Sequence, residues 1–211
     1  MKRAVSLLTA VGALALVGGS ARASTNRVIL DRFHGPFAEA AWEKTTATSS
    51  READTLISQE QDGTTHLNIH EYTTYLDSSG NVTGSVDISG SLTGAEMAFD
   101  TLRLTTAAAS GSVPVTRCSF DAVGNPTGCT DGTLSVSEAW AGKGELFQGS
   151  FNEDHFVVPG DFVFIDRLNG KFRLATATAS IAGDFFDVSD LVFADFGVSN
   201  QLTAMMCSHG C

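Results

Sequence analysis

The fold of this chain is decided by an alternating stretch, Asp62-Gly63-Thr64-Thr65-His66-Leu67-Asn68-Ile69-His70-Glu71-Tyr72, which returns as Asp131-Gly132-Thr133-Leu134-Ser135-Val136-Ser137-Glu138-Ala139-Trp140. Strict alternation of polar and apolar residues after a turn dipeptide predicts a half-buried β-strand. Every second side chain of a strand shares a face. Glu71 and Glu138 therefore each lie on the apolar face of their strand.

A second pair of segments repeats in the same order, Leu102-Arg103-Leu104-Thr105-Thr106-Ala107-Ala108-Ala109-Ser110 and Phe172-Arg173-Leu174-Ala175-Thr176-Ala177-Thr178-Ala179-Ser180. The offset is 67 residues from Leu67 to Leu134 and 70 residues from Arg103 to Arg173. We interpret this order as a degenerate internal duplication, with halves at about 54–113 and 121–180. The period is longer than that of a usual solenoid repeat, so two fused halves of one domain fit better than an array.

The rest of the chain predicts an all-β domain with little helix, a sandwich or a barrel, because short strand signals alternate with turn signals. The strands are expected at 56–61, 65–76, 82–92, 101–110, 113–120, 133–140, 145–151, 161–167, 171–181 and 191–196. Asn169-Gly170 is the strongest local hairpin signal. One or two helical turns are expected within 36–50.

The N-terminus has the three parts of a secretory signal peptide. Lys2 and Arg3 are basic, residues 6–17 are apolar or small, and Ala21-Arg22-Ala23 is a cleavage signal. Cleavage after Ala23 leaves an N-terminal segment at 24–53, the all-β domain at 54–211 and, within it, a tail at 181–211. We expect the protein to be secreted or held in the cell envelope, with no transmembrane segment once the signal is removed.

The chain is acidic, with a formal net charge of −11. Removing Lys2, Arg3 and Arg22 leaves 13 − 3 = 10 basic residues against 24 acidic ones, a net charge near −14. Nucleic-acid binding requires basic residues that displace counterions. We therefore expect no nucleic-acid partner.

The cysteines are Cys118, Cys129, Cys207 and Cys211. An even number in an exported protein predicts two disulfides, for which three pairings are possible. We favour the two local pairings, since Cys118 and Cys129 bracket a turn and Cys207 and Cys211 close a small C-terminal ring. The alternative is a soft-metal site formed by the C-terminal cysteines with Met205, Met206 and His209.

Glu71, Arg103, Glu138 and Arg173 are the first candidate site residues, because all of them lie in the repeated segments. One hypothesis is a pair of carboxylates in a pseudo-symmetric cavity, able to act as acid and base on glycans. The other is that each glutamate forms a structural ion pair with an arginine. A duplication would place both glutamates in similar environments, whereas a catalytic acid and base usually need unlike environments. The repeat therefore favours the structural ion pairs.

Two further groups of residues have ligand chemistry. His66 and His70 are about 13 Å apart on a strand, too far to bind one metal ion. Four aspartates near the C-terminus have carboxylate oxygens suited to calcium, but their spacing does not match a known calcium loop. They are Asp184, Asp187, Asp190 and Asp195. We assign no metal and no cofactor.

The sequence thus favours a secreted, non-catalytic β module with a binding or envelope-interaction role and an unknown ligand or protein partner. Exposed aromatic residues on a concave sheet would suit a carbohydrate; the candidates are Trp42, Tyr72, Tyr75 and Trp140. The alternatives are a secreted hydrolase that uses Glu71 and Glu138 and an extracytoplasmic metal-binding protein. No catalytic residue is assigned.

Overall fold

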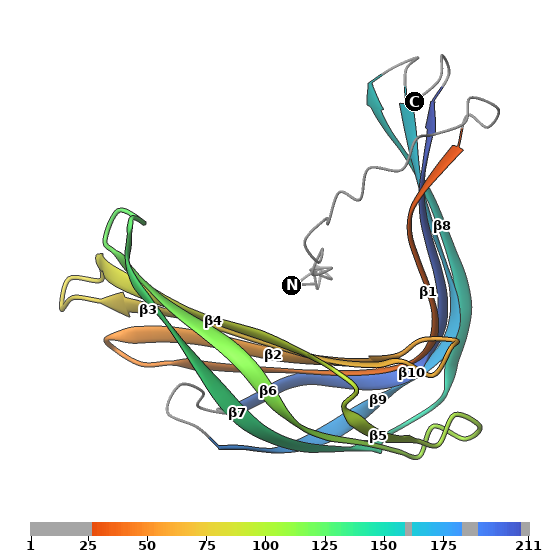
Figure 1. Ribbon diagram of the computed structural model, residues 1–211, viewed down its shortest axis with the longest axis horizontal. Coiled ribbons are helices and arrows are strands. Elements are labelled where there is room, and N and C mark those ends of the chain that lie inside the picture. The colour runs from red at the N-terminus through yellow and green to blue at the C-terminus, as the bar shows by residue number, and fades with distance from the viewer. Residues whose placement is uncertain (1–26, 159–161, 183–189, 208–211) are drawn as a thin grey trace.

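The computed structural model describes residues 27–158, 162–182 and 190–207, and all regular structure in them is β (Figure 1). The strands are β1 (Arg27–Thr45), β2 (Ser49–Gln59), β3 (Thr65–Leu76), β4 (Val82–Thr93), β5 (Glu96–Phe99), β6 (Thr106–Asp121), β7 (Pro126–Gly142), β8 (Phe147–Val158), β9 (Phe162–Ala182) and β10 (Asp190–Cys207). The predicted all-β class is confirmed. Within the described ranges there is no helix with the length and hydropathy needed to cross a membrane.

The strands form one antiparallel sheet that closes into a barrel-like ring. The pairing order is β10-β1-β2-β3-β4-β6-β7-β9, and β9 also pairs with β10. The two halves of β9 pair with different strands of the ring. Residues 175–182 pair with β7, and residues 162–174 pair with β10. β5 adds to β6 and β8 adds to β9 outside this ring.

Two hairpins of the ring are closed by the same five-residue turn. Asp77 accepts backbone N–H groups from Ser79 and Asn81, and Asp121 accepts the equivalent groups from Val123 and Asn125. The fourth residue of each turn is a glycine with a positive φ, 83° for Gly80 and 88° for Gly124, a conformation that an L side chain disfavours. The turn expected between Cys118 and Cys129 is confirmed, and the other turn lies between the strands expected at 65–76 and 82–92.

The core of the barrel is built from alternate residues of each strand. The buried apolar residues of β3 and β7 are Leu67, Ile69, Leu134, Val136 and Trp140, as the alternation in the sequence predicts. Small residues of β1 and β6 lie on the same inner surface; they are Ala38, Ala40, Ala107 and Ala109. A ring of about eight strands has an interior that side chains just fill, and alanines leave room for the tryptophans.

Two local predictions are wrong. The expected helical turns within 36–50 lie mostly in β1, because the segment pairs with β10 and β2. The expected strand at 101–110 begins only at Thr106. Asp100 accepts the backbone N–H groups of Leu102 (3.2 Å) and Arg103 (3.0 Å) and thereby holds 100–105 as a turn, since an aspartate side chain competes with strand pairing.

The predicted hairpin at Asn169-Gly170 is also wrong, because both residues lie inside β9. Gly170 belongs to a row of small residues across four strands, in the order Gly149, Gly170, Ser199 and Gly35. A Cβ on Gly170 would lie 2.5 Å from the carbonyl oxygen of Val198. This glycine therefore permits close approach of the neighbouring backbone. β1, β8, β9 and β10 bend away from the rest of the sheet (Figure 1).

The structure does not show the internal duplication. Leu102 and Arg103 lie in a turn, whereas their counterparts Phe172 and Arg173 lie in β9. Residues 27–53, expected as a separate N-terminal segment, contribute β1 and part of β2 to the closed sheet.

The disulfide between Cys118 and Cys129 is present and joins β6 to β7 at directly paired positions. This confirms one of the two local pairings. Cys211 lies outside the described residues, so the second expected disulfide stays a prediction.

We predict that Gly170→Ala destabilises the fold by about 1–3 kcal/mol, because the new Cβ meets backbone atoms that cannot rotate away. Gly149→Ala is the matched control. It lies in the same row, but its Cβ would meet no atom within 4 Å, so it is expected to be neutral or slightly stabilising. Urea unfolding of both variants measures the difference, and equal midpoints would contradict the role given to Gly170.

Candidate functional site

Glu71 on β3 lies inside the barrel and is 2% exposed. Its Oε1 lies 3.2 Å from Nε of Arg51 on β2 and accepts a hydrogen bond of 3.1 Å from the hydroxyl of Thr73. A buried carboxylate requires such compensation. Arg51, which the sequence analysis did not single out, thus occupies the place expected for Arg103.

Glu138 on β7 is equally buried, but no basic residue pairs with it among those that the structure describes. The hydroxyl of Thr55 on β2 donates a 3.0 Å hydrogen bond to its Oε1. Its Oε2 has no hydrogen-bond partner. Burial raises the pKa of Glu138 to about 7, and the bond from Thr55 opposes this only in part. The carboxyl group is therefore largely neutral below neutral pH.

The two repeated arginines do not meet these glutamates. Arg103 is exposed in the turn before β6. Arg173 donates through Nη2 to the carbonyl oxygen of Gly144 (2.7 Å) and through Nη1 to that of Leu104 (3.5 Å). Arg173 therefore links the loop after β7 to the loop before β6. The expected pairs of Glu71 with Arg103 and of Glu138 with Arg173 are absent among the described contacts.

A line of ionisable side chains crosses the outer face of the barrel. His70 on β3 lies between two carboxylates, with Nδ1 3.3 Å from Asp54 of β2 and Nε2 3.1 Å from Asp87 of β4. The hydrogen bond with Asp54 is the main cause that raises the pKa of His70 to about 9, and the bond with Asp87 adds to it. His70 is thus an imidazolium held between two carboxylates, and His66 instead lies 3.2 Å from Glu60.

The same line continues to Glu39 on β1 and Asp195 on β10, which are directly paired. Burial raises the pKa of Asp195 to about 7, and the charge of Glu39 adds to the shift. Burial and the charge of Asp54 raise the pKa of Glu39. The sequence analysis named Asp195 among possible calcium ligands but missed Glu39, because only strand pairing brings them together.

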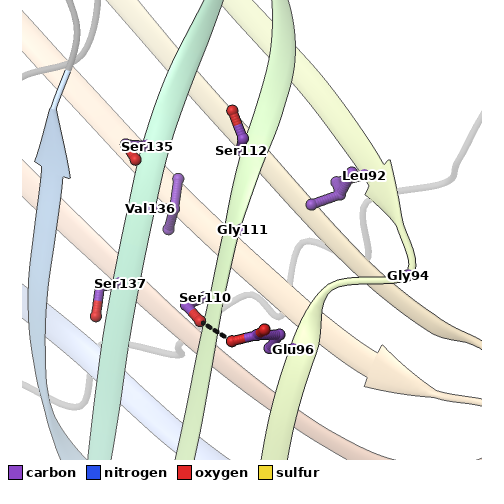
Figure 2. A pocket seen from close by; sticks show the side chains of 9 residues that line it. All are labelled: Leu92, Gly94, Glu96, Ser110, Gly111, Ser112, Ser135, Val136 and Ser137. Carbon is purple, nitrogen blue, oxygen red and sulfur yellow. Dashed lines mark hydrogen bonds between the residues drawn. The ribbon is translucent and has the colours of Figure 1, made fainter.

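A shallow depression of about 560 Å³ lies where β4, β5, β6 and β7 meet. Figure 2 shows its lining, which is mostly serine and glycine with one carboxylate; the residues are Leu92, Gly94, Glu96, Ser110, Gly111, Ser112, Ser135, Val136 and Ser137. The hydroxyl of Ser110 donates to Glu96 (3.2 Å).

The depression follows from a gap in strand pairing. β4 pairs with residues 115–121 of β6 and β5 pairs with residues 107–110, so residues 111–114 have no described partner on that edge. Pro114, which has no N–H to donate, lies in this gap. The edge therefore leaves backbone groups and serine hydroxyls available to a ligand.

The aromatic candidates do not form one binding face. Trp42 and Trp140 are buried, and the indole N–H of Trp140 donates to the carbonyl oxygen of Glu39 (2.9 Å) across the barrel. Tyr72 and Tyr75 are exposed but lie on opposite faces of β3, since they are three residues apart. Asp184 and Asp187 lie outside the described residues.

No group of three or more histidines, cysteines and acidic residues in the described part of the chain is arranged to hold a metal ion. Comparison with protein families, curated proteins and solved structures finds no match to this chain. The site must therefore be interpreted from its own geometry.

We predict that Glu138→Gln makes stability less dependent on pH. The folded-state pKa of Glu138 is raised from 4.5 to about 7. Its contribution to stability is therefore fully present below pH 4.5 and lost as the pH rises through about 7. Relative to wild type, the variant is expected to gain on the order of 3 kcal/mol between about pH 4 and pH 8. Urea unfolding at both pH values measures this gain, and Glu96→Gln, at an exposed carboxylate, is the control.

We predict a pH dependence of the same direction but at higher pH for His70→Gln. The imidazolium stabilises the fold fully below pH 6.5, and this contribution is lost as the pH rises through about 9. Wild type is expected to be more stable than the variant at about pH 6, and the difference is expected to vanish by about pH 10. Thermal unfolding across this range checks it; a constant difference would show that the charge of His70 is not involved.

Proposed function

We propose that this chain is a secreted, non-catalytic β module that binds a ligand rich in hydroxyl groups, such as a glycan, in the depression between β4 and β7. The observation that carries the proposal is the set of hydroxyls beside an unpaired strand edge. Ser112 and Ser135 are directly paired, as are Ser110 and Ser137. Hydroxyl groups both donate and accept hydrogen bonds, as sugar hydroxyls do.

The charges around the depression support an uncharged or cationic ligand. Among the described residues that line the depression, Glu96 alone is ionisable, and the whole chain carries a formal net charge of −11. An anionic ligand would be repelled by this field. A carboxylate such as Glu96 accepts hydrogen bonds strongly from sugar hydroxyls.

The position of Glu71 and Glu138 weighs against the alternative of a hydrolase. A glycosidase places two carboxyl groups on either side of a bond in a cleft that the substrate can enter. Each of these residues is 2% exposed inside the barrel, whereas the serine side chains at the depression alternate to the other face of their strands.

Binding to a glycan array tests the proposal. Wild type is expected to retain a defined set of neutral glycans. The double variant Glu96→Gln, Ser137→Val is expected to bind them at least about tenfold more weakly, because two hydrogen bonds to the ligand are lost. Thr178→Val, on the outer face of β9 outside the depression, is the matched control and is expected to bind as wild type does.

Two results would overturn the proposal. One is equal loss of binding in the double variant and the Thr178→Val control. The other is hydrolysis of a bound glycan by wild type that Glu138→Gln abolishes while the fold stays intact.

A further inference from the structure

Glu39 and Asp195 form an acidic pair on the outer face of the barrel, distant in sequence but opposite each other across β1 and β10. Strand register places Leu174 of β9 beside Asp195 and Leu56 of β2 beside Glu39. The row across four strands is therefore leucine, aspartate, glutamate, leucine. Directly opposite residues of antiparallel strands share a face, so the acidic pair is flanked by apolar side chains on both sides.

Asp195 is unusual because it is buried without compensation. It is 8% exposed, and its Oδ1 is enclosed without a hydrogen-bond partner. Burying a carboxylate is costly unless it is paired or binds a cation. The unpartnered oxygen next to a second carboxylate indicates that an ion or proton is needed to stabilise the pair.

No cationic side chain in the described structure fills this role. The neighbours two residues along β1 and β10 on the same face are Phe37, Ala41, Phe193 and Gly197. The other ionisable group acting on the pair is Asp54, which adds negative charge. His70, the nearest base along the line, already lies between Asp54 and Asp87.

We propose that Glu39 and Asp195 together bind a divalent cation that prefers oxygen ligands, with Ca²⁺ the best fit. Ca²⁺ accepts carboxylates in mono- or bidentate form and tolerates irregular geometry, whereas Mg²⁺ demands near-octahedral coordination. Because two side chains supply only part of the coordination shell, water completes it. The expected affinity is then in the range of about 0.1–1 mM typical of extracellular modules.

A proton competes with the cation for the same pair. Burial, with the charge of Asp54, raises the pKa of Glu39, and burial, with the charge of Glu39, raises the pKa of Asp195. In acid one carboxyl group is neutral and the pair needs no ion, whereas above neutral pH both are charged. Cation binding is therefore expected to strengthen as the pH rises through about 7. This inference does not depend on the serine depression or on its ligand.

The experiment is thermal unfolding of the mature, EDTA-treated protein at about pH 8, with about 10 mM CaCl₂ or NaCl of equal ionic strength. Wild type is expected to gain at least about 4 °C in Tm from calcium, since the ion is then in at least about tenfold excess over Kd. At about pH 5 the gain is expected to fall by more than half, because protons occupy the pair.

Asp195→Asn and Glu39→Gln are expected to abolish the calcium-dependent gain. Both variants should fold, because each removes a charge that the fold disfavours, and their Tm in EDTA is expected to equal or exceed that of wild type. Asp87→Asn is the matched control, since it removes an outer-face carboxylate that serves His70, and it is expected to keep the full calcium gain.

Three results would overturn the proposal. They are no calcium-dependent gain in wild type, an undiminished gain in Asp195→Asn, and an equal gain at both pH values. The first of these would assign the pair to a shared proton alone.

Discussion

The rest of this structure depends on the double pairing of β9. Its C-terminal half completes the sheet beside β7, and its N-terminal half pairs with β10. Without this strand, the edges of β7 and β10 would carry unpaired backbone groups and the sheet would stay open. Closure creates an interior, and the interior gives Glu71 and Glu138 their burial. Within β9, the missing side chain of Gly170 lets the backbone of β10 approach closely.

The interior is a packed core because large and small side chains alternate around the ring. Trp140 spans the barrel from β7 and donates its N–H to the backbone of β1, while alanines of β1 and β6 leave the space that the tryptophans occupy. A filled interior leaves no room for a ligand, so the binding that we propose is assigned to the surface. The polar residues fall into two regions, the serine-rich depression at β4 to β7, which holds the carboxylate of Glu96, and the line of ionisable side chains from β10 to β4.

Charge compensation distinguishes the acidic residues of the fold. Glu71 has Arg51 and Thr73, and Asp54 and Asp87 have the imidazolium of His70. Glu138 and Asp195 each retain a carboxylate oxygen without a partner. Because Glu138 lies in the interior, its carboxylate is stabilised by taking up a proton. Asp195 lies on the outer face beside Glu39, where a cation can bind as well. A buried carboxylate is thus neutralised by a proton on the inner face of the sheet and by a proton or a cation on the outer face.

The sequence by itself determined the all-β class, the turns at Gly80 and Gly124, the disulfide between Cys118 and Cys129, and the burial of Glu71 and Glu138. These features follow from local patterns, because alternation and turn chemistry act over a few residues. Tertiary structure alone decided that Asn169-Gly170 continues a strand, that Arg51 replaces Arg103, and that Glu39 meets Asp195. Each of these depends on strand order and register. Closure of the ring fixes both, and no local pattern encodes which distant strand becomes a neighbour.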